Sequence, residues 1–272
     1  VSDYTNGTYY HKSDLEDCEL FNGIDVSWWQ ARGKKTTLID WSAAHDAGID
    51  FAFVRVASRD TSDGSIYTDT SADSHIQTAL ANDVNVGLYI FSQAVTEDEA
   101  VEEAEYVLDL VDQYNWDVTM PIVMDREAGR TSKKLKAGTL SKAKETAVCQ
   151  AFADTITEAG YEACVYASYS WIRNYINTDE LSDCGLWIAR YNNTTTSNSK
   201  SGTPYADVAF DYDFWQYSSS GKVDGYAKNL DVDFWYKDMS DETTGLKMKS
   251  NTAGSVTLSW DATDDAQKYR VY

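Results

Sequence analysis

NVGLYIFS at residues 85–92 and MPIVMD at residues 120–125 are two apolar runs that decide the fold of this chain. Nearly every position in both runs is apolar, which is typical of strands buried on both faces of a parallel sheet. Between them, Thr96 and Glu99 have the spacing of a capping box, and apolar residues from Val101 to Val111 recur at helical spacing. The stretch therefore predicts one β-α-β unit.

The same alternation extends in both directions from this unit. Apolar, β-rich runs predict strands at 23–29, 51–57, 85–92, 120–125, 164–167, 186–191, 210–218 and 231–236. Helical patterns follow the first five of them, at 41–47, 71–82, after Thr96, at 141–159 and at 169–176. This order indicates an α/β fold, a modified TIM-like barrel of five β/α units followed by three β-strands, over residues 22–240. An open doubly wound sheet is the alternative, although no Gly-rich phosphate loop follows the first strand.

The two ends of the chain depart from this rhythm. Residues 1–21 are polar and irregular, and we expect an N-terminal arm from which a signal peptide is absent or already removed. Residues 246–272 form a short β-rich C-terminal fragment that resembles the opening strands of a fibronectin type III module. No apolar run reaches the length of about 18 residues that a membrane-spanning helix needs.

The composition restricts the partners of the protein. The 44 Asp and Glu residues outnumber the 23 Lys and Arg residues, which gives a net charge of −21. Such a surface repels nucleic acid and anionic lipid, so we expect neither nucleic acid nor a membrane as a partner, and we expect a monomer. The nine Trp and 19 Tyr residues outnumber the eight Phe residues. Aromatic rings with polar edges suit sugar binding, because a pyranose presents an apolar C–H face for stacking.

Other reaction chemistries find little support. The four cysteines, Cys18, Cys149, Cys164 and Cys184, form no CxxC pair and do not cluster with the three histidines, so no metal or other cofactor is expected. Buried free thiols are favoured over a disulfide, because the spacing has no framework pattern. The chain also lacks a GxSxG nucleophile elbow, a phosphate loop and an HExxH helix.

Acidic residues recur where the predicted strands begin or end. Asp25 lies on the first strand, Asp125 and Glu127 close the fourth, and Asp231 opens the last. Active sites of such barrels form at the carboxyl ends of the strands, where a carboxylate after an apolar run is costly without a purpose or a partner. These acids are therefore candidates for catalysis.

The spacing of Asp125 and Glu127 suits acid catalysis at a glycosidic bond. As residues i and i+2 of a strand they point to one face, with Cβ atoms roughly 6.6 Å apart. That separation falls between the usual carboxyl distances of retaining and inverting glycosidases, so it leaves the stereochemistry open. Structural ion pairs with Arg55 and Arg190 are the alternative. Candidate sugar platforms near the neighbouring strand ends are Tyr89, Tyr166, Trp187 and Tyr191.

Seven segments, in order, resemble the glycoside hydrolase family 25 lysozymes, which are N-acetylmuramidases. They are GIDVSWWQ (23–30), FAFVR (51–55), GLYIF (87–91), PIVMDRE (121–127), LWIARY (186–191), FWQYS (214–218) and LDVD (230–233). The resemblance implies the same barrel and a peptidoglycan hydrolase that cleaves the β-1,4 bond from N-acetylmuramic acid to N-acetylglucosamine. Peptidoglycan glycan strands are then the partner, and the location is extracellular or associated with the cell wall.

The resemblance also implies roles for individual residues. Glu127 takes the general-acid position, Asp125 stabilises the positive charge on the sugar, and Asp25 and Asp231 are two further acids. We expect the pKa of Glu127 to be raised by its carboxylate neighbour and by partial burial. The expected substrate contacts are Tyr89, Phe91, Tyr166, Trp187, Tyr191 and Gln216.

Three positions depart from the family pattern. Ile90 stands where many members have His, Asp233 stands where Asn is usual, and the Glu common after the second strand is not evident at 57–60. Two other functions stay open. A cell-wall glycan-binding module without catalysis would have no need of the costly acid pair, and a chitinase-like barrel would want an aspartate where Val123 stands.

Overall fold

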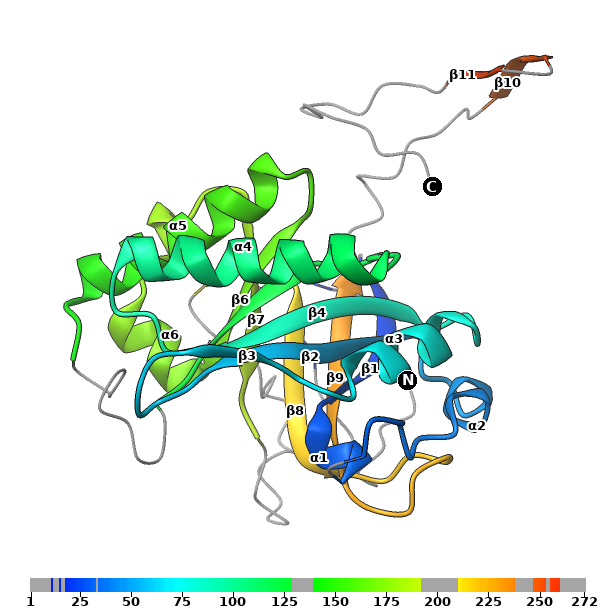
Figure 1. Cartoon of the computed structure of the whole chain (residues 1–272), viewed down its shortest axis with the longest axis horizontal. Helices are drawn as coiled ribbons and strands as arrows, with labels where there is room; N and C mark the ends of the chain where they lie inside the picture. Colours follow the sequence, from blue (N-terminus) through cyan, green and yellow to red (C-terminus); the bar gives the residue numbers. More distant parts are fainter. Residues whose placement is uncertain are drawn as a thin grey trace.

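The computed structural model describes residues 11, 15, 18–32, 34–128, 139–191 and 210–237, and the backbone of 247–252 and 255–259. The strands are β1 (Glu19–Val26), β2 (Phe51–Arg59), β3 (Ile66–Thr68), β4 (Asn85–Ser92), β5 (Ile122–Arg126), β6 (Ala163–Ser168), β7 (Cys184–Ala189), β8 (Phe214–Gly221), β9 (Leu230–Lys237), β10 (Lys247–Thr252) and β11 (Ser255–Ser259). The α-helices are α1 (Trp28–Ala31), α2 (Trp41–Asp46), α3 (Ala72–Leu80), α4 (Glu97–Tyr114), α5 (Lys142–Glu158) and α6 (Tyr169–Tyr175). Figure 1 shows their arrangement, with the long helices α4 and α5 side by side outside the sheet.

Eight strands close into a barrel. Their order is β1-β2-β4-β5-β6-β7-β8-β9, and β9 pairs back with β1. The strands β1, β2, β4, β5 and β6 each lead into helical structure, whereas β7, β8 and β9 follow one another with no α-helix among the described residues between them. The predicted barrel of five β/α units followed by three strands is thereby confirmed.

The last strand of the barrel runs against its neighbours. The other seven are parallel to one another, but β9 is antiparallel to both β8 and β1. The start of β9 therefore lies at the carboxyl-terminal face of the parallel strands, where Asp231 stands opposite Asp25 in the ladder. At the other end of the same ladder, Lys237 stands opposite Glu19.

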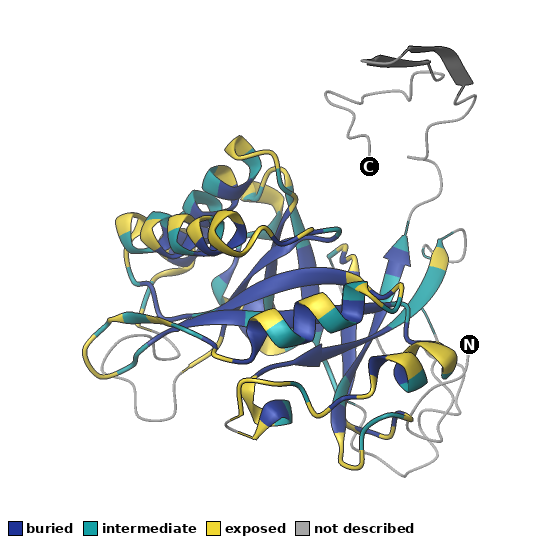
Figure 2. Cartoon of the chain, turned by 45° about the vertical axis from the view of Figure 1, so that its right-hand side comes forward, coloured by how far each residue is buried: buried dark blue, intermediate teal, exposed yellow. Residues whose placement is uncertain are grey.

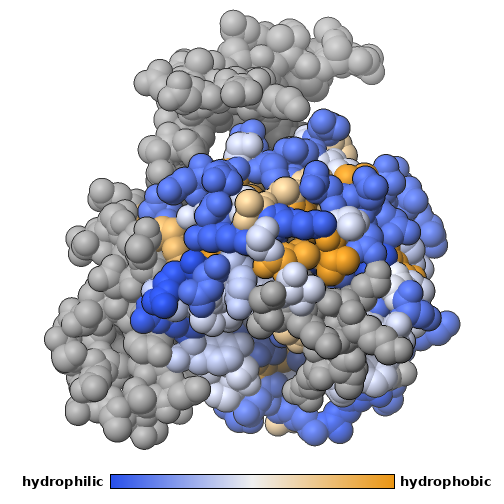
Figure 3. Space-filling view, turned by 90° about the vertical axis from the view of Figure 1, so that its left-hand side faces the viewer, coloured by the Kyte–Doolittle hydropathy of each residue, from blue (hydrophilic) through white to orange (hydrophobic). Residues whose placement is uncertain are grey.

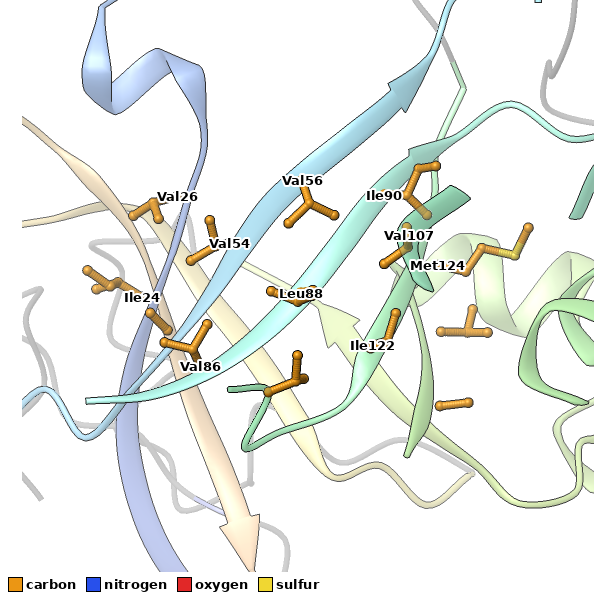
Figure 4. Close-up of a cluster of buried hydrophobic side chains, with 14 of the residues drawn as sticks. Ile24, Val26, Val54, Val56, Val86, Leu88, Ile90, Val107, Ile122 and Met124 are labelled. Carbon is orange, nitrogen blue, oxygen red and sulfur yellow. The ribbon is translucent and has the colours of Figure 1, made fainter. Parts of the chain in front are cut away.

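Alternation along the strands builds two apolar layers. Side chains that point outward pack between the barrel and its helices, and Figure 4 shows this layer with Ile24 of β1, Val54 of β2, Leu88 of β4 and Val107 of α4. Side chains that point inward fill the barrel: Phe51, Phe53, Tyr89, Met120, Val123, Cys164, Trp187 and Phe214. Figure 2 accordingly shows buried strands, and helices whose outer faces are exposed.

Two glycines make room for the interior rings. A Cβ at Gly23 would come within 2.3 Å of the Phe51 ring, and one at Gly87 within 2.4 Å of the Phe53 ring. Both distances are far shorter than van der Waals contact, so the aromatic filling of the barrel requires glycine at these strand positions.

Two helix starts show where local chemistry decided the structure. Gln30 Oε1 accepts the Ser27 N–H at 2.8 Å, a capping box that turns the chain out of β1 into α1. The predicted strand over 23–29 is therefore wrong beyond Val26. At α4, the Thr96 hydroxyl accepts the Glu99 N–H at 3.1 Å as predicted, but the Glu99 carboxylate accepts the N–H of Val95.

Two further differences concern the extent of the sheet. β1 begins at Glu19, so residues 19–21 of the predicted N-terminal arm belong to the barrel. The stretch 58–70, for which no strand was predicted, contains β3, which pairs antiparallel with the end of β2. In the tail, β10 and β11 form an antiparallel pair, and the rest of 246–272 lies outside the described residues. Its resemblance to a fibronectin type III module stays a prediction.

The four cysteines are free thiols; Cys149 and Cys164 are buried as expected, whereas Cys18 and Cys184 are only partly buried. Burial raises the pKa of the Cys149 and Cys164 thiols, which makes both poor nucleophiles. In the part of the chain that the structure describes, no helix combines the length and the apolar character needed to cross a bilayer. Figure 3 shows a face of the molecule on which hydrophilic residues predominate, in keeping with the net charge of −21.

Candidate active site

A pocket of about 600 Å³ opens where the parallel strands end. Its volume lies in the usual range for sites that bind small molecules. The ten predicted site residues all line it: Asp25, Tyr89, Phe91, Asp125, Glu127, Tyr166, Trp187, Tyr191, Gln216 and Asp231. Residues that were not predicted also line it: Ser27, Trp29, Gln30, Arg55, Ser58, Tyr67 and Ala128. The structure therefore brings the predicted residues together, while their roles stay proposals.

The two acids of β5 lie in different environments. Asp125 is 4% exposed, and among the described residues its Oδ1 has no hydrogen-bond partner. Glu127 follows the last strand residue, Arg126, and is exposed in the pocket. Burial, and then the charge of Glu127, raise the pKa of Asp125 well above its usual range, while Arg55 and Arg126 oppose the shift. Glu127 is therefore more exposed than expected, and Asp125 is the buried acid of the pair.

Arg126 points away from the pocket and fixes the end of β5. It is fully buried, and its Nε and Nη2 donate to the two carboxylate oxygens of Glu145 on α5, each at 2.9 Å. Its Nη1 donates to Ser92 Oγ and to the carbonyl oxygen of Ala94, both at 2.9 Å. Since residues alternate along a strand, anchoring Arg126 outward holds its two neighbours toward the pocket.

Gln93 holds the backbone of Glu127 directly. Its Nε2 donates to the Glu127 carbonyl oxygen at 2.9 Å and to the Ser92 carbonyl oxygen at 2.8 Å. The Gln93 N–H in turn donates to the buried Glu103 carboxylate, which pairs with Arg59 at 2.7 Å. The pocket acid nearest the solvent therefore sits on a chain of buried polar contacts.

The arginines suggested as structural partners of the acid pair have other contacts. Arg55 donates through Nε and Nη2 to Asp69 Oδ2, at 3.0 and 2.8 Å. The Arg190 guanidinium lies over the Tyr169 ring, 4.5 Å from its centroid. Arg55 still lines the pocket and is close enough to lower the pKa of Asp125, so it is a cation within an acidic site.

Three more carboxyl groups meet at β1 and β9. Asp25 is buried, and its Oδ2 accepts the Gln216 amide N–H at 2.6 Å. Burial, followed by the charges of Asp231 and Asp233, raises the pKa of Asp25 well above its usual range, against the opposing effect of Gln216. Burial likewise raises the pKa of Asp231 to about 6, with Glu127 adding to the shift.

Asp233 completes this group below the pocket. It is fully buried, its Oδ1 accepts the Trp187 indole N–H at 2.9 Å, and burial and the charge of Asp231 raise its pKa. Among the described residues its Oδ2 has no hydrogen-bond partner, and the Asp25 carboxyl lies close enough for each group to affect the pKa of the other. Two buried carboxyl groups that interact repel each other when both are ionised, so the pair favours a state in which at least one of them is protonated.

Several predicted substrate contacts are committed to protein partners. The amide oxygen of Gln216 accepts the hydroxyls of both Tyr166 and Tyr191, and its amide nitrogen donates to Asp25. Trp187 is 2% exposed and stacks on Phe53 with ring centroids 4.4 Å apart. These side chains form the floor of the pocket, and Trp187 has no open face for a sugar ring.

The exposed rings of the pocket were missed from the sequence. Trp29 is 68% exposed and Tyr67 is 50% exposed, and both line the pocket. Trp29 was placed inside a predicted strand, although the Ser27-x-x-Gln30 capping box signalled a helix start. Tyr67 lies on β3, which is three residues long and gave no strand signal within its polar surroundings.

The acids of the pocket do not form a metal centre. Among the described residues, no group of three or more His, Cys, Asp or Glu side chains has an arrangement that could hold an ion. The chemistry that the arrangement supports is proton transfer and charge stabilisation by carboxyl groups whose pKa values are pushed upward.

Known proteins share this fold and sequence pattern. The chain is 22% identical over 211 residues to the autolytic lysozyme of Clostridium acetobutylicum, which covers 78% of this chain and 54% of that protein. The modular autolysin LytC of Streptococcus pneumoniae, solved with a synthetic peptidoglycan ligand, superposes with a TM-score of 0.63 at 22% identity, over 84% of this chain and 50% of LytC. The chain thus spans about half the length of these two relatives.

A smaller structural relative matches over nearly its whole length. The bacterial lysozyme of Streptomyces coelicolor superposes with a TM-score of 0.57 at 23% identity, over 81% of this chain and 94% of that protein. The sequence model of Glycosyl hydrolases family 25 matches residues 24–226, which contain the end of β1, the strands β2 through β8 and the acids Asp25, Asp125 and Glu127. This chain is therefore a member of Glycosyl hydrolases family 25.

Proposed function

We propose that this protein is a muramidase, a peptidoglycan hydrolase that cleaves the β-1,4 bond between N-acetylmuramic acid and N-acetylglucosamine. The observation that carries the proposal is one pocket in which Asp125 and Glu127 face the acids Asp25 and Asp231. Membership of Glycosyl hydrolases family 25 supports it, as do the relatives named as lysozymes and an autolysin. The reaction is acid-catalysed cleavage of a glycoside.

Glu127 is the proposed general acid, because it combines access to the substrate with a carboxyl neighbour. It is exposed in the pocket, whereas Asp125 behind it is buried. Two interacting carboxyl groups titrate as a unit, so the pair can hold a proton under conditions in which an isolated carboxyl is ionised. A sugar that covers Glu127 displaces its water, which favours the protonated form there and aligns the proton with the leaving oxygen.

Asp125, Asp25 and Asp231 are proposed to stabilise and orient the sugar. In the barrel order β5 is the fourth strand and β9 the eighth, so the β5 acids lie across the pocket from Asp231 and from Asp25 on adjacent β1. A sugar bound between them develops positive charge near carboxyl groups on both sides. Electrostatic stabilisation of this kind is strong in a pocket from which water is displaced.

The natural partner in this proposal is the glycan strand of peptidoglycan, and the place of action is outside the cell or at the cell wall. The autolysin relative was solved with a synthetic peptidoglycan ligand, which supports that substrate class. We propose that the protein acts as a monomer, since one copy of the chain supplies the acid pair and the two facing acids that the proposed reaction uses.

The test is digestion of purified peptidoglycan followed by borohydride reduction and mass analysis of the new reducing ends. Reduced muramic acid ends are expected, and they should be absent with Glu127→Gln. Reduced glucosamine ends would identify a glucosaminidase. Retention on peptidoglycan with no new ends, by a protein that is folded, would identify a wall-binding module without catalysis.

A further inference from the structure

Exposed aromatic rings gather at one end of the pocket. Trp29 and Tyr67 line the pocket, and Trp28 stands beside Trp29. Among the described residues the other large exposed hydrophobic side chains are Leu38 and Tyr114. Leaving rings in water forgoes the free energy of burial, so a cluster of three beside a pocket indicates a surface that a ligand covers.

This aromatic rim, which consists of Trp29 and Tyr67, continues the pocket outward. Trp29 follows β1, which carries Asp25. Tyr67 pairs across the sheet with Ser58, the pocket-lining residue near the end of β2. The two rings thus lie beside the ends of β1 and β2, which are neighbours in the barrel.

One buried carboxylate fixes the rim before any ligand arrives. Asp69 lies two residues after Tyr67. Its Oδ2 accepts the Trp28 N–H at 2.8 Å and the N–H groups of Arg55 Nε and Nη2. Asp69 Oδ1 accepts the N–H and hydroxyl of Ser71, at 3.0 and 2.7 Å. This one side chain thus joins the start of α1, the strand β2 and the segment after β3.

The ring of Trp29 is also supported from the side. The Trp28 ring packs against it edge to face, with centroids 5.0 Å apart and an interplanar angle of 77°. The capping box of Ser27 and Gln30 holds the backbone of this helical turn. Surfaces that are ordered in advance lose less entropy on binding, which suits them to a repetitive and individually weak ligand unit.

We propose that Trp29 and Tyr67 form a distal sugar-binding subsite, which holds an uncharged pyranose unit of the glycan strand outside the two units that flank the cleaved bond. The occupant follows from chemistry: both rings combine an apolar face with a polar edge, as a pyranose does. The pocket carries Asp25, Asp125, Glu127 and Asp231 on a chain of net charge −21, which disfavours an anionic ligand. The inference rests on the proposed function. It predicts that Trp29 and Tyr67 make the protein prefer long glycan strands to short ones.

The first experiment compares kcat/KM on soluble peptidoglycan glycan strands of eight or more sugars, with the lactyl carboxyl groups amidated so that the strands are uncharged, with kcat/KM on the tetrasaccharide prepared in the same way. Trp29→Ala should lower the ratio of the two values at least about fivefold, chiefly through KM on the long strands, since truncating an aromatic anchor costs this much or more. Trp29→Phe, which keeps a stacking face, should restore most of the ratio. Tyr114→Ala, a matched exposed ring on α4 away from the pocket, should leave the ratio unchanged.

The second experiment measures binding without catalysis. In Glu127→Gln, the long strands should protect tryptophan from acrylamide quenching, and the protection should fall when Trp29→Phe is added, because Trp29 is highly exposed. A ratio that Trp29→Ala leaves unchanged, or protection that does not depend on Trp29, would overturn the subsite while leaving the hydrolase intact. If the long strands protect tryptophan but the native chain cleaves no peptidoglycan, the proposed function is wrong and the subsite stands.

Discussion

Arg126 of β5 and Glu145 of α5 form a buried ion pair in which two N–H groups donate to two carboxylate oxygens, each at 2.9 Å. The Trp171 indole N–H of α6 also donates to Glu145, at 3.1 Å. Arg126 stands between Asp125 and Glu127 in the sequence and faces the opposite side of the strand. The same strand end thus presents acids to the pocket and a cation to the helices.

Glu145→Gln should destabilise the barrel strongly, because it leaves the Arg126 charge buried without its counter-ion. Breaking one side of a buried pair costs about 3–5 kcal/mol, which corresponds to a fall in Tm of about 6–20 °C for a domain of this size. Differential scanning calorimetry measures it. The matched control is Glu158→Gln at the exposed end of the same helix, and equal Tm values for the two variants would show that the pair contributes little.

Glu127→Gln should abolish most of the hydrolysis without changing Tm, because Glu127 is exposed and the amide keeps its shape. Loss of a general acid lowers the rate about 10²–10⁴-fold. The measurement is release of reducing ends from peptidoglycan, with Glu105→Gln on the exposed face of α4 as the control. A folded Glu127→Gln variant that keeps more than about a tenth of the rate would exclude Glu127 as the acid.

Asp125→Asn should separate a catalytic acid from a structural one. Burial and the neighbouring Glu127 disfavour the charged form of Asp125 and raise its pKa, so a neutral amide removes an unfavourable charge. Tm at pH 7 should stay equal or rise, while the rate falls. If thermal melting instead showed a large loss of Tm together with a proportional loss of activity, Asp125 would be a structural acid.

Asp231→Asn should change how stability depends on pH. The pKa of Asp231 is raised to about 6 in the folded protein, so the folded state holds this proton more tightly than the unfolded state. Stability from Asp231 is therefore present below the unfolded value near 3.8 and is lost as the pH rises through about 6.

The Tm difference between Asp231→Asn and the native chain should thus be near zero at about pH 4. It should grow at pH 7 to the equivalent of about 2–3 kcal/mol in favour of the variant. His75 also makes stability depend on pH, in the opposite direction, because burial lowers its pKa to about 4. Its contribution is the same in both proteins, so it cancels in the Tm difference. Asp224→Asn, in the exposed turn before β9, is the control, and a difference that does not vary with pH would contradict the assignment.

Asp233→Asn should be tolerated and should stabilise the barrel. Asparagine keeps an oxygen that can accept the Trp187 indole N–H, and it removes a buried acid whose charge opposes ionisation of Asp25. We expect a higher Tm at pH 7 and activity within a few fold of the native rate. Asp233→Ala cannot accept the indole N–H and should lose stability, so identical melting of the two variants would show that this hydrogen bond contributes little.

The order of the fold could be predicted because buried parallel strands are apolar at nearly every position. The direction of β9 could not be predicted, since the residue pattern of a single strand does not show whether it runs parallel or antiparallel to its neighbours. That direction places Asp231 at the pocket, and the sequence signalled only that an acid opens the strand. β3 was missed because three residues, Ile66–Thr68, give no period to recognise.

The acids of the site were easier to predict than its sugar-binding surface. A carboxylate after an apolar run has few structural explanations, so Asp125 and Glu127 stood out. An aromatic residue at a strand end can either pack inside the barrel or contact a ligand, and its burial decides between these two explanations. Trp187 fills the barrel, whereas Trp29 lies in solvent because Ser27 caps a helical turn that lifts it out of the strand.

Glu19 and Lys237 stand opposite each other in the β1–β9 ladder, so the first and last strands of the barrel begin and end side by side. Its polypeptide enters and leaves at neighbouring positions, on the end away from the acids. Segments joined at either position can change in length without crossing the pocket, and the barrel can be inserted in a longer protein. What is attached to the barrel can then vary independently of the acidic pocket.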